Sequence, residues 1–314
     1  MNKVDRISRE QVQKLFNLPL LDLLQEATEL HRKYFPERKI YLNTLISYKT
    51  GACFEDCAYC AQSSRYNSKI EAVGYIKEKE ILAQAEKAKA QGSSRVCISA
   101  SWKEVSEGKH FETILSAGRK IREMGLDVCA TLGFVSVEQL KKLMDNGFSA
   151  YNHNVDTSES FYPNIITTRN YIDRLKTLQR IQKTGLNCCS GGIIGMGESE
   201  NDRIDMLHVL ANREKALFTF PINVLVPIPG TPLESMPPIE IWELLRIIAV
   251  GRILMPQTRI CLAAGRVQMN DEALALSYMA GANAVFAGEK LLTTENTDID
   301  KDLQLFNKLG LKIG

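Results

Sequence analysis

The sequence predicts a (β/α)8 TIM-type barrel with an N-terminal helical extension, because short apolar segments alternate with longer amphipathic segments along most of its 314 residues. Eight of the apolar segments have the length of strands, and charged helical patterns separate them. Glycine directly follows several of these helical patterns, as expected at helix C-caps. Open doubly wound sheets show a similar alternation. The prediction of a closed barrel therefore depends on the number of strand-like segments, which is eight.

The predicted strands are short apolar stretches, and each is followed by a stretch with helical spacing of its apolar residues. The strands are expected over residues 44–48, 95–100, 127–132, 150–155, 187–194, 221–226, 259–263 and 284–287. The helices between them are expected over residues 77–91, 112–124, 137–146, 172–183, 200–213, 239–254 and 272–279. A further helical pattern covers residues 8–34. The expected organisation is an N-terminal helical extension (1–38), the barrel (39–290) and a C-terminal segment that packs on the barrel (291–314).

The composition is that of a soluble globular protein, with 45% apolar residues. The 39 basic and 37 acidic residues are interspersed and give a formal net charge of +2, which argues against nucleic-acid and membrane-surface partners. The first ten residues are too polar for a secretory signal, and charged residues interrupt the apolar stretch at 239–255. We therefore expect a cytoplasmic protein whose eight cysteines are not paired in disulfides.

Three of the cysteines, Cys53, Cys57 and Cys60, are clustered directly after the first predicted strand. Their C-x3-C-x2-C spacing allows three thiolates to hold one iron–sulfur cube, and thiolates are the ligands that such clusters require. Because the loop supplies three ligands, the fourth iron is open to a small molecule. Structural zinc or a four-cysteine ferredoxin site remains an alternative, although each needs a fourth ligand and no other cysteine or histidine lies nearby in the sequence.

This pattern, with Tyr59 before its last cysteine, resembles the signature of the radical S-adenosylmethionine (SAM) superfamily. The likeness extends over nearly the whole chain to one family within it, the biotin synthases. Lys49-Thr-Gly-Ala, Tyr151-Asn-His-Asn and Ile165-Ile-Thr-Thr-Arg are among the segments that carry the likeness. The resemblance implies a [4Fe–4S] cluster whose open iron binds the amino and carboxylate groups of SAM. Reductive cleavage of SAM then gives methionine and a 5′-deoxyadenosyl radical, which abstracts hydrogen from an unactivated carbon.

Four further cysteines, Cys97, Cys129, Cys189 and Cys261, lie on four different predicted strands, so a closed barrel would allow them to converge in its lumen. Because successive strand residues point to opposite faces, only one of the adjacent Cys188 and Cys189 can face the lumen. The resemblance assigns Cys97, Cys129 and Cys189 to a second cluster, the [2Fe–2S] sulfur donor of biotin synthases. Cys188 is then expected to pack outward.

The chain departs from the biotin synthase pattern at the fourth ligand of this auxiliary cluster. The family usually has arginine at the position of Cys261, which here stands between Arg259 and Arg266. A thiolate is a far better iron ligand than a guanidinium group, which predicts an all-cysteine auxiliary site. Arg259 is a weaker candidate for the ligand, and a buried Cys261 that binds no metal is the alternative. Four thiolates suit [2Fe–2S] and also [4Fe–4S]-type clusters, so the composition of this cluster stays open.

Polar residues recur with period two on the fourth predicted strand, at Asn152, Asn154 and Asp156, so we expect them to face one side. Such groups are costly inside a barrel unless partners satisfy them. The resemblance implies that Asn152 contacts dethiobiotin and that Asn154 and Asp156 hold the SAM ribose. A strand end in solvent is the alternative, and His153, which is out of phase, is expected to be structural.

The resemblance also assigns further residues to the two ligands. For SAM, it implies Tyr59 beside the cluster, Arg174 at the carboxylate, and Gly191 and Ile193 of a G-x-I-x-G-x-x-E pattern near the adenine. For dethiobiotin, it implies Asn223 near the ureido ring and Thr293 and Thr294 at the carboxylate. A solvated arginine on a helix surface is the alternative for Arg174.

The resemblance therefore implies insertion of sulfur into dethiobiotin, the final step of biotin biosynthesis, with two rounds of SAM cleavage that remove hydrogen from C9 and then from C6. It also implies a flavodoxin- or ferredoxin-type electron donor and a homodimer. Lipoyl synthase is a rival, but that family carries an additional N-terminal cysteine triplet and no cysteine precedes Cys53 here. Relatives of biotin synthase that act on another substrate commonly lack the strand cysteines. A non-enzymatic iron–sulfur electron carrier would not need the polar row on the fourth strand.

Overall fold

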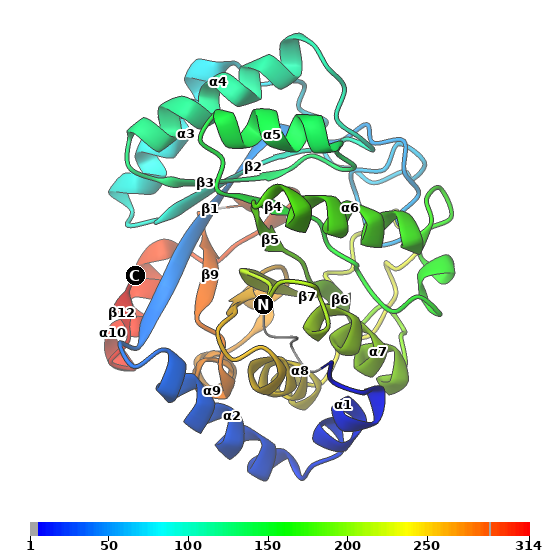
Figure 1. Cartoon of the computed structure of the whole chain (residues 1–314), viewed down its shortest axis with the longest axis vertical. Helices are drawn as coiled ribbons and strands as arrows, with labels where there is room; N and C mark the ends of the chain where they lie inside the picture. The colour runs from blue at the N-terminus through cyan, green and yellow to red at the C-terminus, as the bar shows by residue number, and fades with distance from the viewer. Residues whose placement is uncertain (1–5, 289) are drawn as a thin grey trace.

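Parallel strands form a closed barrel in the computed structural model, which describes residues 6–288 and 290–314 (Figure 1). In order around the barrel they are β1 (Lys39–Lys49), β2 (Arg95–Ala100), β3 (Asp127–Thr131), β4 (Ala150–Asn152), β5 (Asn187–Cys189), β7 (Thr219–Val224), β8 (Arg259–Leu262) and β9 (Ala284–Ala287). The ring closes where Tyr41 and Thr44 of β1 pair with Ala284 and Ala287 of β9. This closure confirms the predicted barrel over the open doubly wound sheet.

Helices alternate with the strands and cover the outside of the barrel (Figure 1). They are α3 (Glu78–Ala90), α4 (Lys109–Glu123), α5 (Val137–Asp145), α6 (Tyr171–Thr184), α7 (Glu200–Ala211), α8 (Ile241–Leu254) and α9 (Asp271–Ala280), with 3-10 turns η1 (Tyr162–Asn164) and η2 (Arg266–Gln268) in two connections. Serine side chains cap two of them: Ser136 accepts from the Gln139 amide before α5, and Ser199 accepts from the Asp202 amide before α7. The helices lie within a few residues of the predicted ranges.

The fourth and fifth strands differ from the prediction. β4 ends at Asn152, and the chain then turns at Asp156, whose φ of 68° lies in the left-handed region. The predicted strand 187–194 is divided into β5 and β6 (Gly192–Ile194), which both pair with β7. Gly191 lies at this break, where a Cβ atom would come within 1.8 Å of the Pro221 carbonyl oxygen. The close approach of β7 therefore requires glycine and separates the two short strands.

Two helices precede the barrel, α1 (Arg9–Phe16) and α2 (Leu20–Tyr34), shown in blue in Figure 1. They pack against α7, α8 and α9 on the outer face of the molecule. The buried side chains of α2 include Leu23, Leu24 and Ala27, which lie on one face of the helix. Arg246 of α8 donates to the Leu18 carbonyl oxygen at 2.8 Å and so fixes the connection between the two helices.

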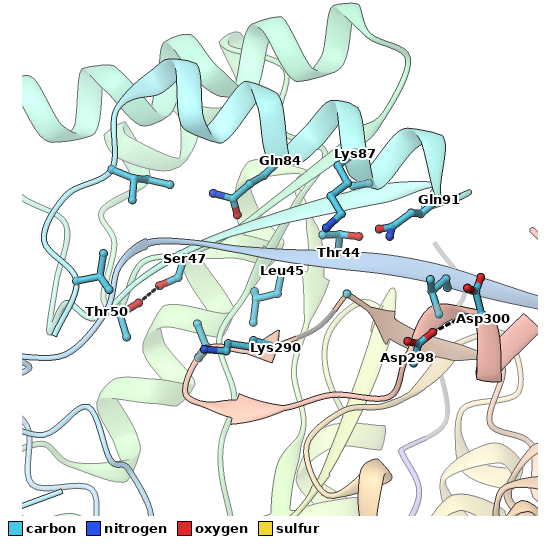
Figure 2. Close-up of a pocket in the computed structure, with 16 residues that line it drawn as sticks. Thr44, Leu45, Ser47, Thr50, Gln84, Lys87, Gln91, Lys290, Asp298 and Asp300 are labelled. Atoms are coloured by element: carbon cyan, nitrogen blue, oxygen red, sulfur yellow. Dashed lines mark hydrogen bonds between the residues drawn. The ribbon is translucent and has the colours of Figure 1, made fainter. Parts of the chain in front are cut away.

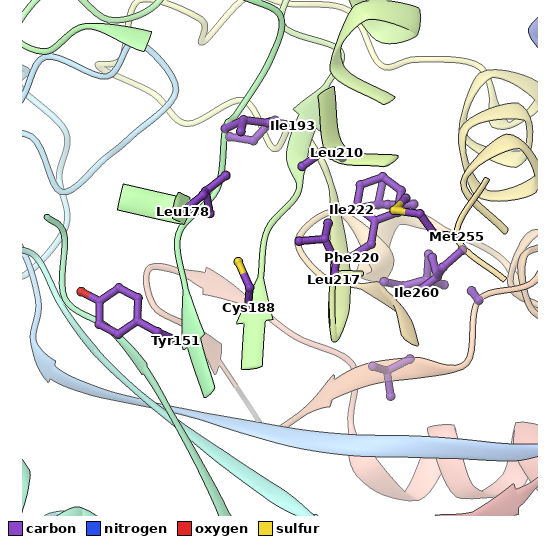
Figure 3. Close-up of a cluster of buried hydrophobic side chains, with 14 of the residues drawn as sticks. Tyr151, Leu178, Cys188, Ile193, Leu210, Leu217, Phe220, Ile222, Met255 and Ile260 are labelled. Carbon is purple, nitrogen blue, oxygen red and sulfur yellow. The ribbon is translucent and has the colours of Figure 1, made fainter. Parts of the chain in front are cut away.

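The apolar core lies mainly between the barrel and its helices, and Figure 3 shows part of it. Cys188 belongs to this layer together with Tyr151 and Leu178, and only 3% of Cys188 is exposed. A smaller cluster in the barrel contains Cys97, Cys129 and Cys189 instead. Within the described ranges, the helices are too short or too polar to cross a membrane.

The C-terminal segment comprises a hairpin of β10 (Lys290–Leu291) and β11 (Thr294–Glu295), then α10 (Ile299–Lys308) and β12 (Lys312–Ile313), which pairs with β1. A buried ion pair fastens it to the barrel: both guanidinium Nη atoms of Arg266 bind the carboxylate of Asp302 on α10. Each side chain of the pair is 1% exposed. Arg266 Nη2 also donates to the Phe286 carbonyl oxygen at 3.0 Å, so one guanidinium joins α10 to β9.

We expect Asp302→Ala to lower the free energy of unfolding by about 3–5 kcal/mol, because it leaves the Arg266 cation buried without its counter-ion. Urea denaturation followed by circular dichroism measures this loss. Asp300→Ala is the matched control, since Asp300 lies on the same helix and is exposed. Equal midpoints for the two variants would contradict the anchoring role of the ion pair.

Candidate active site

The cysteine triplet lies in the loop that follows β1, and the segment Lys49-Thr-Gly-Ala shapes the start of this loop. Lys49 Nζ donates to the carbonyl oxygens of Gly51 at 2.8 Å and of Ala52 at 3.2 Å. Both of these residues have positive φ, 81° and 49°, so the backbone turns sharply here. The amide of Cys53 then donates to the Gln62 carbonyl oxygen at 2.9 Å. The lysine thus binds the carbonyl groups that the turn exposes.

The far side of the same loop is fixed by the threonines and arginine of the Ile165-Ile-Thr-Thr-Arg segment. Arg169 Nε donates to Glu55 Oε2 at 2.8 Å, and Glu55 is 2% exposed. The amide of Thr168 donates to Asp56 Oδ1 at 3.1 Å. These contacts join two segments that are more than a hundred residues apart in the sequence. They give the triplet a rigid support, as a bound metal cluster requires.

None of the eight cysteines forms a disulfide, so all three thiols of the triplet are available as iron ligands. Thiolates are the ligands that iron–sulfur clusters require. Burial raises the pKa of Cys57 to about 12 and that of Cys60 to about 11, so both are protonated thiols when no metal is bound. Metal binding must therefore displace these protons. In the part of the chain that the structure describes, no three Cys, His, Asp or Glu side chains are grouped to hold a single metal ion.

A cavity of about 230 Å³ lies beside this loop, and we call it the loop-side cavity. Eight predicted site residues line it: Tyr59, Cys60, Asn154, Asp156, Ile193, Asn223, Thr293 and Thr294. Apolar residues after β7 form another part of the wall, among them Leu225 and Ile228. A thiol of the triplet therefore borders a cavity with both polar and apolar walls.

The Asp156 carboxylate binds two other side chains at this cavity. Its Oδ2 accepts from the Tyr59 hydroxyl at 2.8 Å and pairs with Arg174 Nη2 at 2.5 Å. Burial and the Asp156 carboxylate raise the pKa of Tyr59 well above its usual value, so Tyr59 remains a hydrogen-bond donor. A buried non-glycine residue with a left-handed backbone is strained, and such strain is typical of functional sites.

Arg174 is 5% exposed, which excludes the solvated surface arginine considered from the sequence. Besides Asp156, it donates through Nη1 to the Asn154 carbonyl oxygen at 2.7 Å and through Nε to the Tyr162 hydroxyl at 2.7 Å. It is not among the described residues that line the loop-side cavity. In this structure Arg174 therefore positions Asp156 and Asn154, and its contact with a SAM carboxylate stays a prediction.

A second cavity, of about 170 Å³, brings together the four strand cysteines, and we call it the cysteine cavity. Its lining includes Cys97, Cys129, Cys189 and Cys261. Cys97 and Cys129 are direct partners across β2 and β3. Cys189 lies in one buried cluster with Cys97 and Cys129, and the adjacent Cys129 thiol together with burial raises the pKa of Cys189 well above its usual value. Cys188 belongs to the outer apolar layer, on the opposite face of β5.

Cys261 is 1% exposed and lines this cavity from β8. Its Sγ lies 4.0 Å from Asn43 Nδ2. Burial raises the pKa of Cys261 to about 12, and the cationic Arg266 acts in the opposite direction. Arg259 is not among the described lining residues, because its guanidinium stacks over the Tyr41 ring at 3.5 Å. The geometry therefore favours Cys261 over Arg259 as the fourth residue facing the other three thiols.

Several polar residues of the cysteine cavity were not predicted from the sequence, among them Arg95 and Thr219. Arg95 Nε and Thr219 Oγ1 are buried and have no hydrogen-bond partner in the described residues. Unsatisfied buried donors are costly, so donors beside four thiols fit a group that presents acceptor sulfides. The signal for Arg95 was available, because it stands two residues before Cys97 and therefore on the same strand face.

The two cavities adjoin, because Asn154 and Asn223 line both of them, whereas Asn152 lines the cysteine cavity. Asn223 Nδ2 donates to the Gly192 carbonyl oxygen at 3.2 Å, and its Oδ1 accepts from the Ala264 amide at 3.2 Å. The polar row therefore continues past the end of β4 and connects the triplet side to the four strand cysteines. His153 is buried outside both linings, as expected for a structural residue.

Gly191 is not among the described lining residues of either cavity, although it lies next to one of their asparagines. Its amide donates to Asn154 Oδ1 at 3.2 Å. Ile193, two residues later, lines the loop-side cavity. The Glu198 carboxylate accepts from the Gly195 amide at 2.9 Å and so fixes the turn after β6. The glycine-rich pattern therefore shapes the wall through its backbone.

Comparison with known proteins identifies two family models along the chain. The Radical SAM superfamily matches residues 47–210, and the Biotin and Thiamin Synthesis associated domain matches residues 221–312. The biotin synthase of Parvibaculum lavamentivorans is 47% identical over 305 residues, which are 97% of this chain and 90% of that protein. The mitochondrial biotin synthase of Arabidopsis thaliana is 46% identical, over 97% of this chain and 81% of that protein.

Solved structures show the same fold at much lower identity. Methylornithine synthase matches with a TM-score of 0.81 at 19% identity, over 99% of this chain and 95% of that chain. A maturase of the [FeFe]-hydrogenase matches with a TM-score of 0.82 at 16% identity, over 98% of this chain and 72% of that chain. These structures support the barrel fold alone. The curated relatives and the family models are similar to this chain in sequence as well. The chain belongs to the biotin synthase family of the radical SAM superfamily.

Proposed function

We propose that this chain inserts sulfur into dethiobiotin to form biotin, with SAM bound in the loop-side cavity and a sulfur-donating cluster in the cysteine cavity. The observation that carries the proposal is that the two cavities adjoin through Asn154 and Asn223. A substrate held at this junction would lie between the source of the radical and the source of sulfur. Electron transfer alone would need no such chamber.

Cys53, Cys57 and Cys60 would hold the [4Fe–4S] cluster, which when reduced supplies the electron that cleaves SAM. Cys60 borders the loop-side cavity, so an open iron there would face the bound SAM. Asn154 and Asp156 would bind the ribose hydroxyls, and Ile193 would contact the adenine. Tyr59 holds one oxygen of Asp156, which orients the carboxylate for its ligand.

Asn152 and Asn223 would bind the ureido group of dethiobiotin, since amides both donate and accept hydrogen bonds. Asn223 already makes one backbone contact through each end of its amide, which fixes its orientation and leaves one N–H and one lone pair for the ligand. Thr293 and Thr294 line the loop-side cavity and would receive the carboxylate. Positioning and the exclusion of water are the tasks of these residues, because hydrogen abstraction by a radical needs no acid–base pair.

Cys97, Cys129, Cys189 and Cys261 would hold the auxiliary cluster, which supplies the sulfur. Cys261 gives this site four thiolates, which suit a [2Fe–2S] cluster or a larger all-cysteine cluster. The unpartnered donors of Arg95 and Thr219 support an acceptor-rich group in this cavity. We further propose a cytoplasmic homodimer that receives electrons from a flavodoxin- or ferredoxin-type donor, as in the family resemblance.

Asp156→Asn is expected to weaken SAM binding by about tenfold to a hundredfold, because a hydrogen bond to a charged group contributes about 1.5–3 kcal/mol. The amide can neither pair with Arg174 nor accept as strongly from the ribose. Isothermal titration of the reconstituted protein with SAM measures the change. Asp173→Asn, on the neighbouring helix and half-exposed, is the control and should bind SAM as the unchanged protein does. A wild-type Kd for the Asp156 variant would remove this residue from the SAM site.

The proposed function is tested by anaerobic incubation of the reconstituted protein with SAM, a reductant and dethiobiotin. We expect methionine, 5′-deoxyadenosine and biotin as products. Formation of 5′-deoxyadenosine without biotin or a thiolated intermediate would overturn the substrate and favour a relative that acts on another molecule. No SAM cleavage at all would favour the electron carrier.

A further inference from the structure

A leucine occupies a strained position at the tip of the β10–β11 hairpin. The strands pair Leu291 with Thr294, so Leu292 and Thr293 form a two-residue turn. Leu292 has a φ of 54°, in the left-handed region that glycine and asparagine adopt readily and leucine does not. Leu292 is also 36% exposed, so burial in an apolar core does not offset this strain. Neither feature stabilises the fold.

The same side chain lines three separate spaces. Leu292 belongs to the lining of the loop-side cavity and of the cysteine cavity. It also lines an outer groove of about 480 Å³ between α3, β1 and the C-terminal segment. Figure 2 shows this groove, with Gln84 and Gln91 of α3 on one side and Lys290 and Asp298 on the other. Leu45 of β1 lines both the groove and the cysteine cavity.

The base of the hairpin is held firmly, so the position of its tip is determined. Asn296 Nδ2 donates to the carbonyl oxygens of Phe286 at 2.8 Å and Gly288 at 2.9 Å. Arg266 Nη2 lies 3.4 Å from Asn296 Oδ1 and also binds Asp302, which links the hairpin to α10. The turn is therefore not free to relax the strain at Leu292 by moving away from the barrel.

We propose that Leu292 is a positioning residue that separates the reaction chamber (the loop-side cavity together with the cysteine cavity) from the outer groove. Leu45 would form the opposing wall. The proposal rests on the proposed function for the chemistry in the chamber. An apolar side chain at the meeting point of three spaces excludes water from a carbon radical and limits its movement toward the groove. The left-handed turn aims this side chain at the junction, which explains why leucine stands where glycine would fit more easily.

Three variants at this position distinguish the effect of the apolar side chain from that of the left-handed backbone. Leu292→Asn and Leu292→Gly suit the left-handed turn and remove the apolar wall, whereas Leu292→Met keeps the wall. A purely structural role predicts that the Asn and Gly variants are at least as stable and react normally. Leu309→Ala is the control, because Leu309 lies in the same C-terminal segment and has the same exposed fraction of 36%.

The first measurement is the ratio of 5′-deoxyadenosine to biotin formed by each holoenzyme. We expect Leu292→Asn and Leu292→Gly to raise this ratio by about tenfold, because a misplaced radical is lost before it reaches sulfur. Melting temperatures should be equal to or higher than that of the unchanged protein. The methionine variant and Leu309→Ala should keep the original ratio.

The second measurement does not depend on turnover: it is the rate at which an external iron chelator removes iron from the oxidised holoenzyme. We expect several-fold faster removal from the Asn and Gly variants, and unchanged rates for Leu292→Met and Leu309→Ala. If the unchanged protein formed no biotin, the proposed function would be wrong. The rate of iron removal would still show whether Leu292 separates the cavities from the outer groove. Unchanged ratios and chelation rates in the Asn and Gly variants would overturn the proposal.

Discussion

Replacement of Cys60 by alanine is expected to abolish the reductive cleavage of SAM. Cys60 is the thiol of the triplet that borders the loop-side cavity, so its loss removes a cluster ligand at the point where SAM would bind. Residues that merely support a metal ligand can lower activity by about 10- to 100-fold, and we expect a larger loss from a ligand itself. Formation of 5′-deoxyadenosine under dithionite, measured by liquid chromatography, gives the result.

Cys188→Ala is the matched control for this substitution. Cys188 is 3% exposed, more deeply buried than Cys60, and packs in the apolar layer outside the barrel, so no cluster depends on it. This variant should cleave SAM at nearly the original rate, with a small loss of stability from the smaller side chain. Substantial 5′-deoxyadenosine formation by Cys60→Ala would mean that the triplet does not hold the SAM-cleaving cluster.

Cys261→Ala is expected to eliminate biotin formation and to leave SAM cleavage largely intact. Cys261 faces the cavity of Cys97, Cys129 and Cys189 and lies outside the lining of the loop-side cavity. Its loss should therefore affect the auxiliary cluster selectively. Iron and sulfide quantitation with Mössbauer spectroscopy should show that one class of iron decreases and that the [4Fe–4S] component remains.

A different result is expected if Cys261 binds no metal. A buried cysteine that binds no metal would cost only a cavity on replacement, and the auxiliary iron would be unchanged. Cys188→Ala again provides the comparison, because it removes a similarly buried thiol from the outer face of the barrel wall. Equal auxiliary iron in the two variants would refute coordination by Cys261.

Strand alternation was enough to predict much of the barrel and its lumen. The bounds of β2 and β9 agree with the sequence prediction to the residue, since each is a short, buried apolar run between polar segments. The period of two also required that Cys188 and Cys189 face opposite sides, and the structure places one in the outer core and the other in the cysteine cavity.

Other features depend on contacts that no local pattern contains. Asp156 has a left-handed backbone and binds Arg174, which is on a helix that looks amphipathic and solvated in the sequence. The role of Leu292 depends on the relative position of a hairpin and three cavities. In each case the decisive partner is distant in the sequence, so tertiary packing outweighs local propensity.

Electron paramagnetic resonance shows whether Cys53, Cys57 and Cys60 hold a cluster with an open iron that binds SAM. The sample is the reduced, anaerobically reconstituted protein, with and without SAM. We expect saturating SAM to change the signal of the reduced [4Fe–4S] cluster, and we expect Cys60→Ala to show no such change. An identical spectrum of the unchanged protein with and without SAM would contradict this expectation.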